Sequence, residues 1–333
     1  MAAALAVLLG GCGSPNEPAP TPAAPTISCP ANITMRGVPG GIQSVTYPAP
    51  SVTGGAPPVT MTCTPTSGAS FGMGTTAVSC TAVDAASRQS QCSFSVTLTP
   101  LILSVTKYAA FGDSLTEGEN GRRLTLGLGF IDPTATYPVY LQSRLNAEYP
   151  GQSITVRNWG YSGEPVGDGA NTRLQGLLAT EKPGALLLLD GYNNLFLTCA
   201  PGASNTPQCS QAITDVALGV RDLIRIGKRP EYGVKYIFVS TLTPPGPFLG
   251  TPPDRRIAND AIVRANAQIS SMVRAEGVTL VDTYPTFLGH EAEYTDQDGL
   301  HLRPPGYQAL ADSFFSVIRT TVTSTPGFRQ DSN

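Results

Sequence analysis

Residues 107–120, KYAAFGDSLTEGEN, lead from a short apolar run into Gly112-Asp113-Ser114 and then into charged residues and glycine. An apolar run that ends in glycine is typical of a buried strand, so the serine is expected at the carboxyl end of that strand. Four similar runs follow: SITVRNWG at 153–160, GALLLLDG at 184–191, VKYIFVST at 234–241 and GVTLVDT at 277–283. Because strands buried on both faces read as continuous apolar runs, these segments predict a parallel sheet.

Helical patterns separate the expected strands. They occupy five segments: 137–149, 170–180, 213–226, 255–277 and 304–322. Strands that alternate with helices predict right-handed βαβ units and a doubly wound α/β domain, which we place at residues 107–322. The polar residues 323–333 are expected to form a flexible tail.

Four polar or glycine-containing stretches lie after the first three strands and after the last. They are GDSL at 112–115, NWGYSG at 158–163, GYNN at 191–194 and DGLH at 298–301. Functional groups in open α/β sheets gather beyond the carboxyl ends of the strands. We therefore expect these stretches to lie on one rim, although they are far apart in the sequence.

In this order, the four stretches resemble the four sequence blocks of the GDSL or SGNH hydrolase superfamily, over essentially residues 107–322. The resemblance implies a flavodoxin-like three-layer α/β/α fold and an esterase or lipase that needs no metal or cofactor. It implies that Ser114 is the nucleophile and that His301 and Asp298 complete a catalytic triad. It also implies an oxyanion hole formed by the backbone N–H groups of Ser114 and Gly163 and the side-chain amide of Asn193.

The chemistry of these residue types agrees with the implied roles. A serine hydroxyl is a weak nucleophile that needs a base, and imidazole titrates near working pH. A carboxylate fixes the tautomer of the imidazole and stabilises the imidazolium that forms. Preorganised N–H donors then stabilise the negative oxygen of the tetrahedral intermediate.

The chain contains only two histidines, so a mechanism with serine and histidine must use one of them. His290 lies in an acidic loop, and we expect a solvated side chain there. Ser70 fits a G-x-S-x-G pattern at 68–72, but it lacks a strand-turn-helix context. Asp113 is expected to stabilise the turn before the nucleophile and not to be the triad acid.

The surroundings of the predicted site show one departure and three long loops. Asn194 stands where the third block of the family often has aspartate, which predicts altered tuning of activity and not its loss. Residues 117–135 form a Gly-rich insertion, Cys199 and Cys209 bracket nine residues, and 241–254 are rich in proline. We expect these loops to form walls that select the substrate; surface decoration is the alternative.

Residues 27–100 have a different texture, with short alternating stretches rich in Val and Thr and bounded by Gly and Pro. This pattern predicts a small antiparallel β-sandwich. The stretches CPANI at 29–33, SVTYPAPSVTGG at 44–55 and GTTAVSCTAVDAASRQSQCSFSVTL at 74–98 resemble a hyalin-repeat module, an immunoglobulin-like extracellular domain. The resemblance implies adhesion or spacing.

The chain begins with MAAALAVLLGGC, which resembles the lipobox of bacterial lipoproteins. The resemblance implies that Cys12 is acylated and that residues 1–12 are a signal segment; an ordinary signal peptide is the alternative. Residues 13–26, GSPNEPAPTPAAPT, are expected to form an extended Pro-rich linker. The expected location is therefore outside the cytoplasm, as a membrane-anchored periplasmic or cell-surface lipoprotein or as a secreted protein.

Without Cys12, six of the seven cysteines remain, and an even number in an exported protein favours three disulfides. None of them forms a C-x-x-C pair, and two histidines are too few for a usual zinc site. The four cysteines of the hyalin-like module allow three connectivities, of which we choose Cys29–Cys92 and Cys63–Cys80. Cys199 and Cys209 form the third expected pair.

Composition excludes one class of partner. The net charge is −3 and no block of Lys or Arg occurs, which argues against nucleic acid binding. The leading hypothesis is an exported serine esterase that acts on small-molecule or polysaccharide-borne esters. The alternative is a surface adhesion or glycan-binding lipoprotein with a catalytically silent hydrolase-like domain, in which the β module contacts the cell surface or glycan. A peptidase would share the triad chemistry but has no support from the resemblance.

Overall fold

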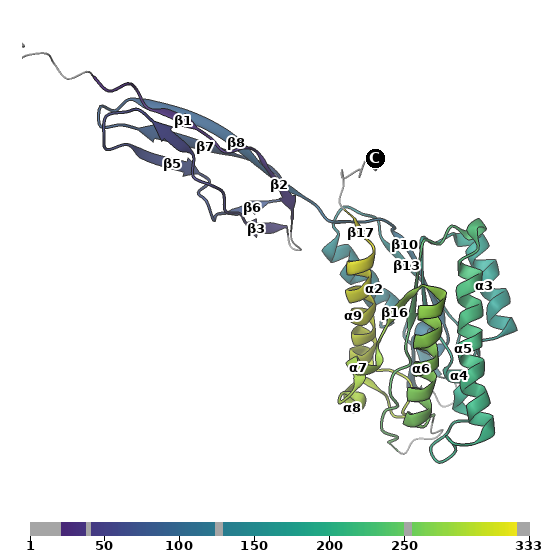
Figure 1. The fold of residues 1–333 in the computed structure, drawn as a ribbon. Coiled ribbons are helices and arrows are strands. Elements are labelled where there is room, and N and C mark those ends of the chain that lie inside the picture. The colour runs from purple at the N-terminus through teal and green to yellow at the C-terminus, as the bar shows by residue number, and fades with distance from the viewer. Residues whose placement is uncertain (1–20, 38–40, 124–128, 250–254, 325–333) are drawn as a thin grey trace, which may run out of the picture. The chain divides into compact units, whose positions relative to one another are not determined.

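The computed structural model of the chain describes residues 21–37, 41–123, 129–249 and 255–324. It divides into two compact units, Met1–Pro100 and Leu101–Asn333 (Figure 1). The expected signal segment with Cys12, and residues 13–20 of the expected linker, lie outside the described residues.

The first unit is an all-β domain. Its largest sheet has the strand order β2-β8-β7-β5, and two short pairs, β1-β4 and β3-β6, accompany it. The strands are β1 (Thr26–Ser28), β2 (Ile33–Arg36), β3 (Ile42–Ser44), β4 (Ser51–Thr53), β5 (Thr60–Thr64), β6 (Ser70–Gly72), β7 (Gly74–Val83) and β8 (Gln89–Thr99). Alternate residues of β7 and β8 point into a core around Val78, Val96 and Leu98. The all-β class predicted for this part of the chain is confirmed.

Two disulfides connect the strands of this unit. Cys29 is bonded to Cys92, and Cys63 on β5 is bonded to Cys80, which lies opposite it on β7. Both pairs are the ones expected from the sequence. A disulfide restricts the unfolded chain, and each typically contributes about 2–4 kcal/mol to stability.

The turn between β7 and β8 is fixed by Asp84. Its carboxylate accepts hydrogen bonds from the backbone N–H groups of Ala56, Ala86 and Arg88 and from the Arg88 guanidinium, at 2.7–3.0 Å. The bond from Ala56 is the largest cause that lowers the pKa of Asp84 to about 2, and the Arg88 contacts add to it against the opposing effect of burial. The turn therefore depends on a charged carboxylate.

The second unit is a three-layer α/β/α domain on a parallel sheet with the strand order β13-β10-β14-β15-β16. The strands are β10 (Lys107–Gly112), β13 (Thr155–Gly160), β14 (Ala185–Leu189), β15 (Tyr236–Ser240) and β16 (Thr279–Val281). In chain order this is 2-1-3-4-5, the flavodoxin-like arrangement, so the predicted fold class is confirmed. Every residue of β14 is buried, as its continuous apolar run predicts.

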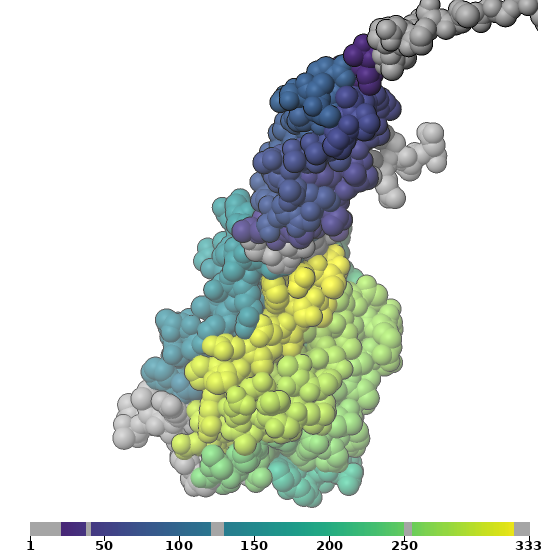
Figure 2. Space-filling view, turned by 90° about the vertical axis from the view of Figure 1, so that its left-hand side faces the viewer, coloured from purple at the N-terminus to yellow at the C-terminus, as the bar shows by residue number. Residues whose placement is uncertain are grey.

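Helices cover both faces of this sheet (Figure 1). On one face α2 (Tyr137–Glu148) packs against α9 (Pro304–Thr321), and Figure 2 shows yellow α9 beside teal α2 at the surface. On the other face α5 (Pro207–Gly227) packs between α3 (Asp168–Glu181) and α6 (Asn259–Glu276). In the described part of the chain, no helix combines the length and the apolar character that a membrane crossing requires.

Short elements complete the second unit. They are α1 (Ser114–Glu117), α4 (Tyr192–Phe196), η1 (Pro230–Tyr232), α7 (Tyr284–Phe287) and α8 (Glu291–Tyr294). The insertion at 117–135 contains a hairpin, β11 (Glu119–Arg123) and β12 (Gly129–Ile131), and residues 124–128 lie outside the described residues.

The end of the chain differs in one detail from the expected tail. Residues 323 and 324 form β17 (Thr323–Ser324), which pairs antiparallel with β9 (Ile102–Leu103) because the end of α9 returns the chain to the start of the domain. Residues 325–333 of the expected tail lie outside the described residues.

We predict that Asp84→Asn removes an acid-sensitive part of the stability. A carboxylate with a lowered folded pKa stabilises the fold above its ordinary pKa of about 3.9, and this contribution is lost as pH falls. The variant should therefore unfold at a lower temperature than the wild type at neutral pH, and the two should converge as pH falls towards about 2. Calorimetry of the full chain over a pH series measures this. A difference that stays constant with pH would contradict the prediction.

Candidate active site

The residues predicted to act together lie near the carboxyl ends of the sheet strands. Ser114 follows β10 and opens α1, Gly163 follows β13, and Asn193 lies in α4 after β14. Asp298 and His301 lie in the loop before α9. Since parallel strands end at the same edge, segments far apart in the sequence reach one rim.

The structure brings Ser114, His301 and Asp298 into direct contact. The Oγ of Ser114 lies 2.9 Å from Nε2 of His301, and Nδ1 of His301 lies 2.5 Å from Oδ2 of Asp298. The Oδ1 atom of Asp298 accepts the backbone N–H groups of Leu300 and His301, both at 3.0 Å. The imidazole is buried and is therefore held in one orientation between an acid and a hydroxyl.

The charge state of Asp298 fits this arrangement. Burial raises the pKa of Asp298, but the hydrogen bond and charge of His301 and the two backbone N–H groups outweigh burial and bring the pKa below its ordinary value. Asp298 is therefore a carboxylate at neutral pH. It accepts a hydrogen bond from the Nδ1–H of His301, which leaves Nε2 free of a proton and able to accept the hydroxyl proton of Ser114.

The turn that carries Ser114 requires glycine on two adjacent strands. A Cβ atom on Gly112 would lie 1.9 Å from the carbonyl oxygen of Leu189, and one on Gly160 would lie 2.1 Å from the backbone nitrogen of Glu117. Asp113 caps α1, because its Oδ1 accepts the N–H of Leu115 at 3.0 Å. The missing side chains let α1 pack directly on the strand ends, which places Ser114 at the rim.

The turn after β13 carries Gly163, and the short helix α4 after β14 carries Asn193. Gly163 has a φ of 81°, in the left-handed region that favours glycine. The backbone N–H of Tyr161 donates to the Gly112 carbonyl at 3.0 Å, and Nδ2 of Asn193 donates to the Glu164 carbonyl at 3.1 Å. A primary amide has two N–H groups, so one of them fixes Asn193 to this loop and the other can serve a ligand.

Arg173 is a supporting residue that the sequence analysis did not single out. Its Nε donates to both carboxylate oxygens of Glu164 at 2.9 and 3.0 Å, and its Nη1 donates to the Trp159 carbonyl at 2.7 Å. Its Nη2 reaches the Gly112 carbonyl at 3.3 Å, and the guanidinium lies 4.0 Å from the ring centre of Phe111. One arginine in a helix carries no sequence signal, yet this one ties the Gly163 loop to β10 and β13.

Glu119 is a second residue that was missed. Its Oε2 lies 3.5 Å from Nε2 of His301, and its Oε1 lies 3.9 Å from Arg255. Its backbone carbonyl accepts the hydroxyl of Tyr307 at 2.5 Å. Glu119 therefore places a second negative charge near the imidazole, on the side opposite Asp298, where it attracts the positive charge that forms on the ring.

The contacts of Asn194 explain why asparagine can stand where the family often has aspartate. Its Oδ1 accepts the N–H of Val166 at 3.0 Å, and its Nδ2 donates to the carbonyl of Val166 at 3.1 Å. An amide side chain can both accept and donate in this way, whereas an ionised aspartate at the same position could only accept. Asn194 thus links α4 to the Gly163 loop and stands apart from the reacting groups.

The residues set aside from the sequence lie elsewhere. His290 precedes α8 with its side chain 53% exposed, where Nδ1 lies 3.3 Å from Oε2 of Glu293 and the ring stacks on Tyr294. Ser70 is an exposed residue of β6 in the first unit, and β6 is paired with β3. His290 makes its contacts away from Ser114 and Asp298, and Ser70 belongs to the other unit.

The predicted walls contain a disulfide and a loop that contacts the triad region. Cys199 is bonded to Cys209, and the carbonyl of Cys199 accepts the N–H of Ala258 at 2.7 Å. The disulfide therefore joins the turn after α4 to the start of α5, and the hydrogen bond joins the same turn to the segment before α6.

The proline-rich segment 241–249 runs beside residues 297–299. Gly246 N–H donates to the carbonyl of Gly299 at 3.0 Å, and Leu249 N–H donates to that of Gln297 at 3.1 Å. These bonds place the segment against the loop that carries Asp298. Residues 250–254 of this predicted wall lie outside the described residues.

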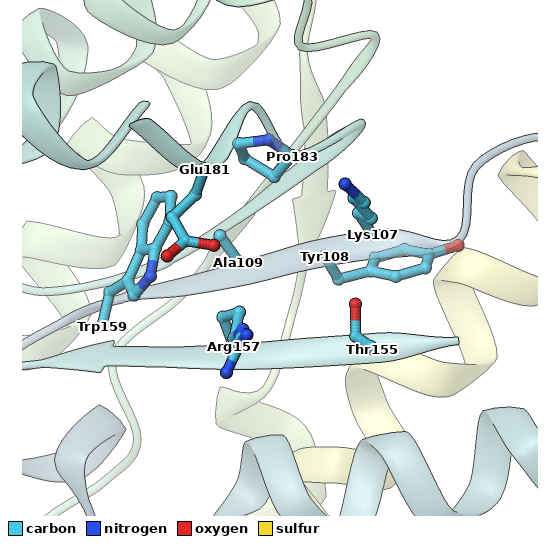
Figure 3. Close-up of a pocket in the computed structure, with 8 residues that line it drawn as sticks. All are labelled: Lys107, Tyr108, Ala109, Thr155, Arg157, Trp159, Glu181 and Pro183. Carbon is cyan, nitrogen blue, oxygen red and sulfur yellow. The ribbon is translucent and has the colours of Figure 1, made fainter. Parts of the chain in front are cut away.

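A small pocket of about 150 Å³ lies along β10 and β13 (Figure 3). It is lined by Lys107, Tyr108, Ala109, Thr155, Arg157, Trp159, Glu181 and Pro183. Its lining includes none of the residues predicted to act together. The pocket is therefore separate from the candidate active site.

Comparison with protein families gives a match over residues 110–309 to the GDSL-like lipase/acylhydrolase family. This match covers more than half of the chain. The chain belongs to this family. The GDSL protein is accordingly an ester-hydrolysing enzyme, and residues 22–98 match the HYR domain, the hyalin-repeat module expected from the sequence. Both resemblances predicted from the sequence are confirmed.

Several solved structures are similar to this GDSL enzyme. They include a lipase/acylhydrolase from Enterococcus faecalis (20% identity, 65% of this chain and 96% of that chain, TM-score 0.48) and an aryl esterase from M. smegmatis (18%, 65% and 99%, 0.48). A third is the acetylxylan esterase Axe2 from Geobacillus stearothermophilus (21%, 65% and 95%, 0.48). No curated protein matches the chain.

We predict that Asn194→Asp weakens the second unit by about 1 kcal/mol at neutral pH, because an ionised carboxylate cannot donate to the Val166 carbonyl. The deficit relative to the wild type should shrink below about pH 4, where the new carboxyl is protonated and can donate again. Urea unfolding followed by the fluorescence of Trp159, the one tryptophan of the chain, measures this. Equal stability of the two proteins at neutral pH would show that the two-point bond to Val166 contributes nothing.

Proposed function

We propose that this protein is an extracytoplasmic serine esterase that hydrolyses acyl or acetyl esters through Ser114, His301 and Asp298 and an acyl-enzyme intermediate. The observation that carries the proposal is the continuous chain of contacts from Ser114 Oγ to His301 at 2.9 Å and from His301 to Asp298 at 2.5 Å. An ionised acid, a buried imidazole and a hydroxyl in this order form the constellation that activates serine for attack.

In the first half of the reaction, Ser114 Oγ attacks the ester carbonyl carbon while its proton passes to Nε2 of His301. The carbonyl oxygen becomes negative and accepts N–H groups from the Ser114 and Gly163 backbones and the Asn193 side chain. Collapse of this intermediate breaks the bond to the alcohol oxygen, which takes the proton from Nε2. The acyl group is then bonded to Oγ and the alcohol leaves.

The second half reverses these roles. Water gives a proton to Nε2 of His301 and its oxygen attacks the acyl carbon, with the same three N–H donors facing the oxyanion. The bond to Oγ breaks, Ser114 recovers its proton from Nε2, and the carboxylic acid leaves. Asp298 keeps its charge throughout and stabilises the imidazolium formed in each half.

Exposed apolar side chains beside the site support an acyl or alkyl binding surface. Tyr161 is 59% exposed and lies two positions before Gly163. Leu249 is 56% exposed and is held by its backbone next to the loop of Asp298. Side chains of this kind lower the cost of bringing an ester from water to the rim.

The location of the protein has separate support. Three disulfides and a HYR domain indicate an extracellular protein. The proposal adds that Cys12 carries a lipid anchor and that the HYR domain lies near the cell surface or a glycan. The sequence around Cys12 supports the anchor, although that residue lies outside the described part of the chain.

We predict that Ser114→Ala and His301→Ala each lower kcat on short-chain nitrophenyl esters by at least about 10⁴-fold, because the nucleophile or its base is lost. Ser70→Ala and His290→Ala are the matched controls and should keep wild-type rates. Steady-state assays with purified full-length protein measure the effect. Full activity in the Ser114 variant would refute the proposed mechanism.

A fluorophosphonate probe separates the esterase from a silent adhesion protein. It reacts with an activated serine, so it should label the wild type and fail to label Ser114→Ala. A wild-type protein that binds no probe would favour the silent domain.

We also predict that Cys12→Ser moves the protein from the membrane fraction to the soluble fraction and removes incorporation of a labelled fatty acid. Each acyl chain attached at Cys12 would add membrane affinity through its buried methylene groups, and the variant cannot be acylated. Fractionation of a bacterial host that processes lipoproteins, with activity assayed in each fraction, gives the readout. Equal fatty-acid labelling of both proteins would overturn the anchor.

A further inference from the structure

Two aspartates lie side by side behind the proposed nucleophile. Gly112 at the end of β10 is in register with Leu189 at the end of β14, so Asp113 and Asp190 are the next residues on neighbouring strands. Asp113 is 0% exposed and Asp190 is 3% exposed. Two carboxyl groups in an apolar interior cannot both be ionised without a large cost, because each charge loses water and repels the other.

Each of these carboxyl groups uses one oxygen and leaves the other without a partner. Oδ1 of Asp113 accepts the N–H of Leu115 at 3.0 Å, and Oδ1 of Asp190 accepts the N–H of Gly191 at 2.7 Å. The Oδ2 atoms of both residues are buried and accept no well-formed hydrogen bond within the described residues; the backbone N–H of Tyr192 faces the Asp113 carboxyl and lowers its pKa without reaching Oδ2 in good geometry. A buried carboxyl oxygen without a partner raises the free energy of the folded state. Two such oxygens, on residues that follow neighbouring strands, can form a hydrogen bond with each other only if a proton lies between them.

The electrostatic surroundings are consistent with one retained proton. Burial raises the pKa of Asp113 to about 7. Burial, and after it the charge of Asp113, raises the pKa of Asp190 well above its ordinary value. Both shifts favour a pair that keeps one proton at neutral pH.

Other titratable and charged groups face the two aspartates from the surrounding elements. They are Tyr137 on α2, Glu164 before α3, Arg173 on α3, Tyr192 on α4, His301 before α9 and Tyr307 on α9. Among them the cation Arg173 is already hydrogen-bonded to Glu164 and to backbone carbonyls, and His301 is engaged by Asp298 and Ser114. Neither replaces a proton between the two Oδ2 atoms.

We propose that Asp113 and Asp190 share one proton between their Oδ2 atoms and that this hydrogen bond holds the turn of Ser114 against the turn of Asn193. Asp113 caps the helix that starts at Ser114, and Asp190 precedes the short helix that contains Asn193. The shared proton thus fixes the distance between two of the proposed oxyanion donors. Asp113 and Asp190 are positioning residues that act through their neighbours.

Infrared spectroscopy of the full-length protein tests the shared proton directly. At about pH 8, roughly four units above the ordinary Asp pKa of about 3.9, the wild type should still show the C=O band of a protonated carboxylic acid. Asp190→Asn should remove that band. Tyr137→Phe is the matched control, because it removes a hydroxyl that faces Asp113 and leaves both carboxyl groups, so the band should remain.

Kinetics test the positioning role and rest on the proposed function. Asp190→Asn replaces the shared proton by a permanent N–H donor, so it should keep kcat within about threefold of the wild type, whereas Asp190→Ala should lose at least tenfold. The wild type should lose kcat at alkaline pH as the shared proton leaves, and Asp190→Asn should lack that loss. A purely structural carboxyl would give the same pH profile in both proteins.

The results distinguish this inference from the proposed function. A wild type without a protonated-acid band at about pH 8, or a band that survives in Asp190→Asn, overturns the shared proton whether or not the enzyme is active. A band that behaves as expected in a protein without esterase activity would leave the shared proton standing and would remove the proposed function. An Asp190→Asn variant that folds, by circular dichroism, but is as impaired as Asp190→Ala would overturn the positioning role.

Discussion

The parallel register of β10 with β13 and β14 is the constraint on which the candidate site depends. It aligns Gly112 with Gly160 on one side and with Leu189 on the other, so three turns leave the sheet at the same level. The absence of side chains at the two glycines lets these turns pack against one another. A change in register by one residue would move the serine, glycine and amide groups apart and leave no common oxyanion position.

Much of this arrangement could be predicted from the sequence. The continuous run at 185–189 revealed a strand buried on both faces, and polar residues after strand ends marked Ser114 and Asn193 as members of one rim. The scarcity of histidine then left two candidate bases, of which His301 alone stands in one of the four stretches that follow the strands. Fold class followed from these local patterns because it depends on periodicity, and the family followed from the resemblance of four short sequence blocks.

The supporting groups could not be predicted in the same way. Arg173 lies in the middle of a helix, and its role depends on carbonyl groups of two strands and on Glu164. Glu119 was visible in the opening stretch, but its approach to His301 depends on the hairpin that follows the nucleophile. These contacts join residues far apart in the sequence, and a single sequence carries no signal of such pairings.

The contact between Ser114 and His301 joins positions 187 residues apart, and the imidazole comes from the last loop before the final helix. A nascent or partly exported chain therefore contains the hydroxyl long before it contains the base. Every fragment that stops short of position 301 lacks the imidazole that contacts the Ser114 hydroxyl. The order of the chain thus delays hydrolytic capacity until the segment that carries His301 has been synthesised.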